Sequence, residues 1–356
     1  MKILVLCGDL KQLGGVTNFY LMLMPYLGKN YTFLPRVLVK NVIVKIFIFL
    51  YTLFRFIYYM MFGRYDLVLL NPSLGKTAVQ RDMVYAFLTK KIFRKKLMVF
   101  WHGWDFNYEK NIDAEMIKRF QQTFFKAEKM FVLASAFEKS LRKWGYQNSV
   151  QLMTTCYRDF EISRKQEKSP SQPVQLLFLS RVEIAKGIIE LLDAFKIILT
   201  QYKEISVKLI IAGDGNSLHE VKNYVEDNTI SDIEFTGYIR GKEKEVVLGK
   251  SDIFILPSYG EGMPCALLEA MGAGLAVITT GVGGIPDFFE NGKMGYMIDS
   301  ANPEKIADAI LKLLNHPDLI QKIGAYNKTY AREHFTAEKV AEKLHNSLVG
   351  KNSGRI

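Results

Sequence analysis

The sequence predicts an α/β protein made of two doubly wound parallel sheets, each in its own domain. In both halves of the 356-residue chain, short apolar runs alternate with longer stretches that carry a helical pattern. A polar segment with two prolines separates the halves. With 49% hydrophobic and 23% charged residues, the chain is globular and long enough for two hydrophobic cores.

The first domain, residues 1–160, has expected strands at the apolar runs 2–7, 66–70, 97–101, 130–134 and 150–153. Residues 161–173 have the composition of a linker. The second domain, residues 174–330, has expected strands at 175–179, 207–212, 253–257 and 275–279. Ligands of such sheets bind beyond the carboxyl ends of the strands, which predicts a site in a cleft between the domains.

Two glutamates in the run 259–272 are the most informative feature of the chain. Glu261 lies in a glycine-rich loop after the strand 253–257, and Pro264 is expected in the first turn of a helix, where its missing N–H costs nothing. Glu269 follows about a turn and a half inside that helix. A helix start attracts phosphate, and carboxylates beside it suit hydroxyl groups. The run predicts a pocket for a nucleotide diphosphate sugar, and two solvated glutamates on an ordinary strand–loop–helix unit are the alternative.

Four further motifs lie in the second half of the chain. Ser180-Arg181-Val182-Glu183-Ile184-Ala185-Lys186-Gly187 follows an apolar strand, and three glycine-containing segments occupy 211–215, 235–238 and 281–286. In this order the five motifs resemble those of the retaining family 4 glycosyltransferases (glycosyl transferases group 1). Members have the GT-B fold, in which two Rossmann-like domains face each other across a cleft. The resemblance is specific between residues 176 and 300, and it departs at Ser180, where members usually have glycine.

The resemblance implies a role for each motif residue. Arg181 and Lys186 would stabilise the departing diphosphate, because negative charge grows there as the glycosidic bond breaks. Glu261 would bind the 3- or 4-hydroxyl of the sugar, and Glu269 would bind the ribose hydroxyls. The other residues implied in donor binding are Gly213, Tyr238, Gly262, Met263 and Pro264. The family pattern also implies that a C-terminal helix, 331–356, packs back on the first domain.

Residues of the first domain are expected to complete the site. Gly14 and Gly15 follow the first strand, where family members bring a glycine backbone close to the diphosphate and donor sugar; an ordinary turn is the alternative. His102 ends the strand 97–101 and precedes a glycine. The resemblance therefore implies that His102 contacts the donor sugar near the reacting carbon. Asn71 and Asp105 are expected to contact the acceptor.

Composition argues against a metal or other cofactor. No Asp-x-Asp sequence occurs, so cationic side chains rather than a metal are expected to bind the diphosphate. The three cysteines, Cys7, Cys156 and Cys265, form no C-x-x-C pair. Their odd number favours a reducing compartment and argues against a disulfide scaffold or a zinc site.

The charge of the chain is unevenly divided. Residues 1–160 hold 24 Lys and Arg against 10 Asp and Glu, whereas the remainder of the chain is nearly neutral. A basic first domain predicts an anionic partner. The sequence contains no nucleic-acid-binding motif, which favours an anionic membrane surface over nucleic acid.

The stretch 41–62 is the candidate for membrane contact. On a helical projection its polar residues Asn41, Lys45, Thr52, Arg55 and Tyr59 fall within roughly 80°, and the rest is apolar. Charges inside the stretch make a transmembrane span costly, so an in-plane helix is favoured over a span. Packing of the apolar face against the first sheet remains the alternative.

The sequence is therefore interpreted as a cytoplasmic glycosyltransferase peripherally associated with the inner face of the membrane. It would move a hexose, with retention, from a UDP- or GDP-sugar to a glycan or lipid-linked acceptor in cell-surface polysaccharide or glycolipid synthesis. A sugar-nucleotide epimerase or hydrolase of the same fold, and a non-catalytic sugar-nucleotide or membrane-binding module, are the alternatives.

Overall fold

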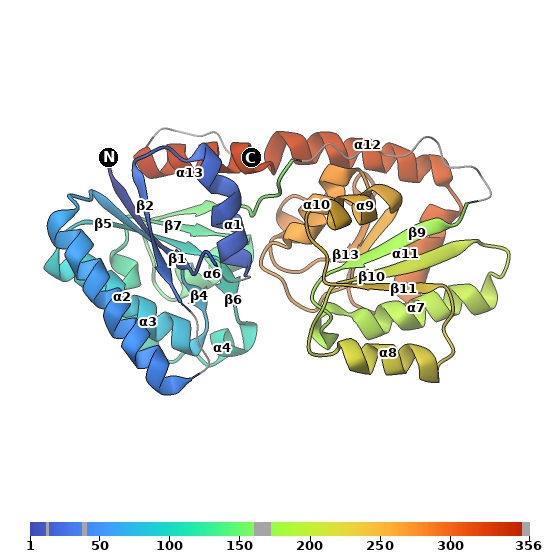
Figure 1. Ribbon diagram of the computed structural model, residues 1–356, viewed down its shortest axis with the longest axis horizontal. Helices are drawn as coiled ribbons and strands as arrows, with labels where there is room; N and C mark the ends of the chain where they lie inside the picture. Colours follow the sequence, from blue (N-terminus) through green and yellow to red (C-terminus); the bar gives the residue numbers. More distant parts are fainter. Residues whose placement is uncertain (12–13, 38–40, 160–171, 351–356) are drawn as a thin grey trace. The chain divides into compact units, whose positions relative to one another are not determined.

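The computed structural model describes residues 1–11, 14–37, 41–159 and 172–350 (Figure 1). The chain forms two compact units. The N-terminal unit consists of Met1–Cys156 and the C-terminal helix α13 (Ala337–Val349), and the C-terminal unit is Tyr157–Thr336. Most of the expected linker, 161–173, lies outside the described residues, as does the end of the expected C-terminal helix beyond residue 350.

The N-terminal unit has a six-stranded sheet in the order β2-β1-β3-β5-β7-β8, and every pairing in it is parallel. Its strands are β1 (Ile3–Gly8), β2 (Tyr31–Arg36), β3 (Leu67–Leu70), β5 (Lys96–Trp101), β7 (Lys129–Val132) and β8 (Ser149–Leu152). The central strands β1 and β3 are almost entirely buried and consist mainly of Leu, Ile and Val, as expected for a parallel sheet covered on both faces. A two-stranded pair, β4 (Ser73–Leu74) with β6 (Gly103–Trp104), lies beyond the ends of β3 and β5.

Helices cover both faces of this sheet (Figure 1). The larger ones are α1 (Gly15–Leu23), α2 (Val42–Phe62), α3 (Lys76–Phe87), α5 (Ala114–Gln122) and α6 (Ser135–Lys143), and α4 (Phe106–Lys110) is short. α13 packs against α1, so the end of the described chain belongs to the N-terminal unit. α2 packs against β2, and its side chains contact α3 through Phe56 and Tyr85, whose ring centroids are 5.1 Å apart.

The C-terminal unit repeats the plan with the strand order β11-β10-β9-β12-β13-β14, again parallel throughout. The strands are β9 (Val174–Leu179), β10 (Val207–Ala212), β11 (Ile233–Gly237), β12 (Ile253–Leu256), β13 (Ala276–Thr280) and β14 (Gly295–Ile298). The helices are α7 (Ile188–Gln201), α8 (Leu218–Asp227), α9 (Lys242–Lys250), α10 (Cys265–Ala273), α11 (Pro303–Leu314) and α12 (Pro317–His334). The central strands β9 and β12 pair with each other, so the segments that follow them are neighbours.

The predicted fold class is confirmed: both units are doubly wound α/β layers with parallel sheets. The apolar runs did not predict β2, β11 or β14, and all three lie at the edge of a sheet. An edge strand has a neighbour on one side only, and most side chains of these three strands are only partly buried, so they form no continuous buried run.

Candidate functional site

Five sequence motifs meet at the carboxyl ends of the central strands of the C-terminal unit. Backbone hydrogen bonds join their loops directly. The N–H of Val182 donates to the carbonyl of Asp214 at 3.1 Å, and that of Gly213 donates to the carbonyl of Gly237 at 2.8 Å. On the other side of β9, the N–H of Gly284 donates to the carbonyl of Gly262 at 2.7 Å. The motifs therefore form one contiguous surface at the edge of the sheet where α/β proteins bind ligands.

Two of these loops approach so closely that only glycine fits. At Gly213 the backbone φ is 148°, and an added Cβ would lie 1.8 Å from the carbonyl oxygen of Ser180. At Gly283 φ is 61°, and a Cβ would lie 2.3 Å from the carbonyl oxygen of Glu261. These glycines allow the loops after β10 and β13 to pack directly on the loops that carry the charged residues.

Glu261 is held by a lysine from a neighbouring loop. The ammonium group of Lys186, which follows β9, lies 2.7 Å from Oε1 of Glu261, which follows β12. The hydroxyl of Ser258 donates to the same oxygen at 2.7 Å. The two charged side chains are only 12% and 10% exposed. The adjacency of β9 and β12 therefore brings together two residues that are 75 positions apart in the chain.

Glu269 has a cationic partner that the sequence analysis did not identify. Lys244, on α9, places its ammonium group 2.5 Å from Oε1 of Glu269, on α10. Both α9 and α10 are regular helices that contact each other. Lys244 belongs to none of the five motifs, and only the packing of the two helices shows that it faces Glu269.

The start of α10 differs by one residue from the expectation. Pro264 is the N-cap, with the extended values φ −74° and ψ 114°, and the helix begins at Cys265. Proline adopts this conformation readily because its φ is restricted near −65°. Glu269 is thus the fifth residue of a nine-residue helix and lies almost fully buried.

The remaining predicted donor residues show different degrees of exposure. The side chain of Arg181 is 70% exposed, and its guanidinium pairs with Glu183 at 2.5 Å rather than with the carboxylates of the site. Tyr238 is exposed at the end of β11, whereas Met263 is buried. The roles of these residues in donor binding remain predictions.

In the N-terminal unit, the predicted glycine pair opens a helix. Gly14 is the N-cap of α1 and has extended backbone, and Gly15 is the first helical residue. A Cβ at Gly15 would meet no atom of the described part of the chain within 4 Å. The approach of a diphosphate to this backbone stays a prediction.

His102 follows β5, at the carboxyl ends of the central strands of the N-terminal unit. Its Nε2 lies 3.0 Å from Oδ1 of Asn71, and its ring lies over that of Phe100 with centroids 3.9 Å apart. The residue as a whole is half-buried. Burial and, to a smaller extent, the positive charge of Arg36 lower the pKa of His102 to about 3. The imidazole is therefore neutral at physiological pH and cannot serve there as a positively charged group.

The structure gives the two predicted acceptor residues local partners. Asn71 is 3% exposed, and its amide oxygen and nitrogen both bond to protein atoms, so its side chain has no surface to offer an acceptor. This corrects the expected role of Asn71. Oδ1 of Asp105 accepts hydrogen bonds from the N–H groups of Asn107 and Tyr108, at 2.9 and 3.0 Å, and caps α4. Asp105 is nevertheless exposed, and its contact with an acceptor stays a prediction.

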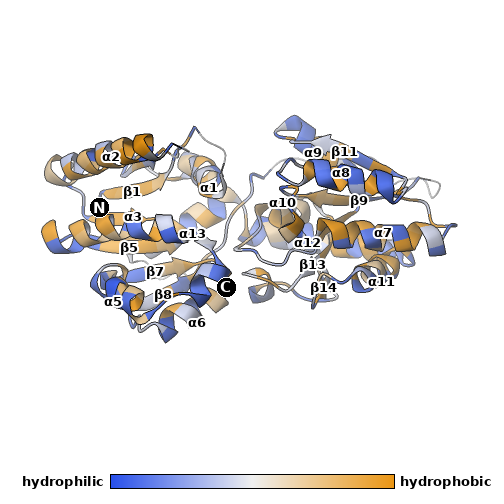
Figure 2. Ribbon diagram, turned by 90° about the horizontal axis from the view of Figure 1, so that it is seen from below, coloured by the Kyte–Doolittle hydropathy of each residue, from blue (hydrophilic) through white to orange (hydrophobic). Residues whose placement is uncertain are grey.

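Helix α2 shows an unusual distribution of exposed side chains. Its buried side chains form a narrow stripe, Thr52, Phe56 and Met60, at spacings of four residues, and the half-buried Phe49 beside it contacts Tyr85. Its outward face carries large apolar side chains that are 53–68% exposed: Ile43, Ile46, Phe47, Leu50, Tyr51, Phe54, Tyr58, Met61 and Phe62. Figure 2 shows α2 as mainly hydrophobic along its length. Only the stripe is core, and of the predicted polar arc Thr52 lies inside while Lys45 is exposed.

By length and composition, α2 could also cross a membrane through Ile43–Phe62.

Within the described residues, no group of three or more His, Cys, Asp or Glu side chains is placed to hold a metal ion.

Comparison with known proteins assigns the C-terminal unit to a family. Residues 159–330 match the family model of the glycosyl transferases group 1. The chain carries a glycosyl transferases group 1 domain. This group 1 domain contains all five motifs and both lysine–glutamate pairs.

Two curated relatives show how far the similarity to this chain extends. WcaL of Salmonella typhimurium, a putative colanic acid biosynthesis glycosyltransferase, is 24% identical over 71% of this chain and 64% of its own length. The N-acetyl-alpha-D-glucosaminyl L-malate synthase of Bacillus anthracis is 31% identical over 47% of this chain and 43% of its own length. The chain thus spans less than two thirds of these relatives.

Solved structures show that the likeness of fold extends beyond the group 1 domain. Anabaena Alr3699/HepE in complex with UDP has a TM-score of 0.76 at 16% identity, covering 98% of this chain and all of that one. Sucrose-phosphate synthase from Thermosynechococcus elongatus also has a TM-score of 0.76, at 17% identity over 99% of this chain. At such identities the likeness concerns the fold alone, and the expected GT-B fold is confirmed.

Proposed function

We propose that the protein is a retaining glycosyltransferase that moves a hexose from a UDP- or GDP-sugar to a glycan or lipid-linked acceptor. The proposal rests on two ion pairs in the C-terminal unit, Lys186 with Glu261 and Lys244 with Glu269. Carboxylates accept hydrogen bonds from sugar hydroxyls, and ammonium groups bind phosphate. A nucleotide diphosphate sugar presents both kinds of group along one molecule.

The two carboxylates would bind different parts of the donor. Glu269, almost buried on α10, would accept the ribose hydroxyls, and Glu261 would accept the 3- or 4-hydroxyl of the sugar. A carboxylate has about four lone-pair sites, so each glutamate can bind a hydroxyl and still accept from its lysine.

The cationic side chains would stabilise the leaving nucleoside diphosphate. Lys186 is already fixed beside Glu261, and the exposed Arg181 would exchange Glu183 for the diphosphate. Preorganised charges that face developing negative charge are usually the largest contribution to such catalysis. In this proposal the reaction uses no metal, because the cationic side chains neutralise the diphosphate.

Groups of the N-terminal unit would act on the sugar and the acceptor. His102 would contact the donor sugar near the reacting carbon, and Asp105 would orient the acceptor hydroxyl. In the proposed reaction the acceptor oxygen bonds to the anomeric carbon as the bond to the diphosphate oxygen breaks. Both events occur on the same face, so configuration is retained, and the leaving phosphate takes the proton of the acceptor.

Several comparisons support this proposal. UDP is bound in the solved complex of Anabaena Alr3699/HepE. Two relatives, WcaL and the capsular polysaccharide biosynthesis glycosyltransferase CapM of Staphylococcus aureus, are named for polysaccharide synthesis. We therefore propose cell-surface polysaccharide or glycolipid synthesis as the pathway class.

We further propose that the enzyme is cytoplasmic and binds the inner face of the membrane through α2. Ten or so exposed apolar side chains on one helix exceed what an ordinary surface carries, and an in-plane helix buries such a face at the level of the lipid headgroups. Residues 1–160 carry 14 more basic than acidic side chains, which suits an anionic leaflet.

Calorimetric binding of UDP and GDP, without metal, to the wild-type protein and to Glu269→Ala tests the proposed function. We expect one diphosphate to bind selectively, and Glu269→Ala to weaken it by roughly tenfold or more. Glu234→Ala, which removes an exposed glutamate of the same unit, is the matched control and should bind normally. Absence of binding to the wild-type protein would overturn the proposal, and turnover of the sugar nucleotide without any acceptor would identify a hydrolase or epimerase instead.

A further inference from the structure

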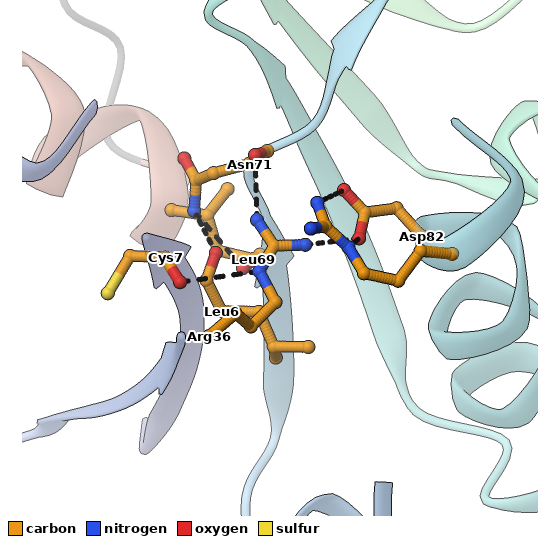
Figure 3. A network of polar contacts seen from close by, with 7 residues as sticks. Leu6, Cys7, Arg36, Leu69, Asn71 and Asp82 are labelled. Atoms are coloured by element: carbon orange, nitrogen blue, oxygen red, sulfur yellow. Dashed lines mark hydrogen bonds and ion pairs between the residues drawn. The ribbon is translucent and has the colours of Figure 1, made fainter. Parts of the chain in front are cut away.

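The side-chain amide of Asn71 has a defined orientation at the carboxyl end of β3. One of its polar atoms lies 2.9 Å from the carbonyl oxygen of Leu6 and 3.4 Å from that of Leu69 (Figure 3). Carbonyl oxygens only accept hydrogen bonds, so the atom that faces them must be the nitrogen, Nδ2. The amide oxygen, Oδ1, consequently points to the opposite side.

Oδ1 of Asn71 has two neighbours, and both must donate to it. The hydroxyl of Tyr20 lies 2.6 Å away, and Nε2 of His102 lies 3.0 Å away. An amide oxygen has no hydrogen to give, so a hydrogen bond to His102 requires the proton on Nε2. In a neutral imidazole the other nitrogen, Nδ1, then carries a lone pair and can only accept.

A buried ionic cluster keeps Asn71 in this position. The guanidinium of Arg36 donates to the carbonyl oxygens of Asn71, at 3.0 Å, and Cys7, at 3.3 Å, and pairs with Asp82 on its third side (Figure 3). Arg81 pairs with the same carboxylate at 2.8 Å. Since Arg36 and Asp82 are almost fully buried, the ends of β1, β2 and β3 are tied to α3 in one arrangement.

Neither a second proton nor a ring flip offers His102 an alternative to this hydrogen bond. It is neutral, as its lowered pKa requires. It packs on Phe100 with the two ring planes tilted by 31°, and edge-on to Phe19, whose centroid is 5.0 Å from its own. A ring flip would place a carbon against Oδ1 and leave a buried acceptor with one donor fewer.

We infer that Asn71 is a positioning residue: it holds His102 as the Nε2–H tautomer, so that Nδ1 is the atom offered to substrate as a hydrogen-bond acceptor. In this state His102 recognises a hydroxyl that donates, such as one on the hexose ring, and it cannot donate to the sugar or to a phosphate. The identity of the substrate rests on the proposed function, whereas the tautomer does not.

The tautomer is measured on the full-length protein without any ligand, by long-range ¹H–¹⁵N correlation of ¹⁵N-labelled histidine, with His102→Gln to assign the signal. We expect the wild-type His102 to show a protonated Nε2, an unprotonated Nδ1 and an Nε2–H proton that exchanges slowly enough to be observed. A protonated Nδ1 in the wild-type protein would overturn the inference without reference to any variant.

Three substitutions distinguish positioning from mere packing. Asn71→Leu removes the acceptor at similar volume and should lose the observable Nε2–H proton and mix the two tautomers. Tyr20→Phe removes only the other donor to Oδ1, so His102 should keep its Nε2–H signal. Asn71→Asp keeps an acceptor at this position, so its His102 should also keep the Nε2–H signal. This variant tests the inference even if Asn71→Leu fails to fold. A lost signal in Tyr20→Phe or Asn71→Asp, or an unchanged one in folded Asn71→Leu, would contradict the inference.

Kinetics give a second readout for folded variants. If Nδ1 accepts from the sugar mainly in the transition state, Asn71→Leu should lower kcat by about tenfold with a smaller change in KM for the donor, and Asn71→Asp should recover part of kcat. Failure of the proposed function would appear as no turnover in the wild-type protein, with the tautomer result unaffected.

Discussion

The ammonium group of Lys244 lies 2.5 Å from Oε1 of Glu269, and the two residues come from different helices, α9 and α10. Glu269 is 9% exposed, so this cation is the near neighbour of a carboxylate that is largely removed from water. Removing a charged carboxylate from water costs several kcal/mol of stability unless an opposite charge pairs with it. Lys244 therefore gives the proposed ribose-binding group an ionic partner and adds a positive charge beside the proposed diphosphate.

Replacement of Lys244 by alanine should weaken nucleoside diphosphate binding by roughly tenfold, since a charged hydrogen bond to a nearly buried carboxylate is lost. Lys244→Arg, which retains the charge, should bind more tightly than Lys244→Ala. Calorimetry with the diphosphate that the wild-type protein prefers is the measurement.

The control is Lys250→Ala on the same helix, because Lys250 pairs with the exposed Glu234. Its effect on binding should be within about twofold, as for other surface ion pairs. Tighter binding by Lys244→Ala than by the wild-type protein would show that Lys244 competes with the ribose instead of supporting its site.

Arg181 and Lys186 should both be needed for turnover but should differ in their effect on stability. Arg181 is 70% exposed, so Arg181→Ala should change the free energy of unfolding by less than about 0.5 kcal/mol. Lys186→Ala leaves Glu261 with a single hydroxyl partner at 10% exposure and should cost about 1–3 kcal/mol.

Each of these two variants should lower kcat by about 100-fold or more, the usual loss when a group that stabilises developing charge is removed. Urea unfolding and a donor-turnover assay provide the two readouts. Full activity of Arg181→Ala would refute its role with the diphosphate.

The outward face of α2 should bind anionic vesicles. Replacing the exposed Phe47, Leu50 and Phe54 by serine should reduce vesicle binding by at least about 100-fold, because each apolar side chain contributes about 1–2 kcal/mol when it leaves water. Vesicle co-sedimentation with anionic and neutral lipids measures the effect.

Two controls separate membrane contact from core packing. Val246→Ser changes an exposed apolar residue of the C-terminal unit and should leave vesicle binding unchanged. Phe56→Ala, on the buried stripe of α2, should cost about 3–5 kcal/mol of stability. Unfolding of the triple serine variant would show that the outward face is core after all.

Asp82 should be a major determinant of stability in the N-terminal unit. Asp82→Asn leaves two arginines, one of them almost fully buried, without their carboxylate and should cost about 3–5 kcal/mol in urea unfolding. Burial alone would raise the pKa of Asp82, but Arg36 and Arg81 lower it below its ordinary value of 3.8. Its ionised form thus stabilises the fold above about pH 4 and loses this contribution as the pH falls further. Equal stabilities of wild-type and variant at pH 7 would contradict this role.

His102 should add to the loss of stability in mild acid. Its pKa is about 3 in the folded protein and 6.5 in its ordinary state, so the unfolded chain binds the proton first as the pH falls. Stability due to His102 is complete above pH 6.5 and declines between pH 6.5 and 3. The wild-type protein should therefore lose more stability than His102→Gln between pH 7 and pH 5, and an inflection of the His102 ring signal near pH 6.5 would contradict the low pKa.

Much of the fold follows from local pattern. Buried parallel strands such as β1 and β12 are continuous apolar runs, and the doubly wound class follows from their alternation with helices. Three of the four edge strands, β2, β11 and β14, escaped prediction because they form no continuous buried run, whereas the edge strand β8 was predicted. The motif residues of the proposed donor site could be recognised because the glycines and glutamates serve a local geometry at each strand end.

The class of fold, the five motifs and the charge difference between the halves can be read from the amino-acid order, because each depends on residues within one segment of the chain. Which distant side chains meet follows only from the folded chain: Lys186 with Glu261, Lys244 with Glu269 and Asn71 with His102. The folded chain likewise places Asn71 inside and most of the apolar face of α2 outside. Pairing of this kind depends on strand order and helix packing, and no local pattern of residues specifies either.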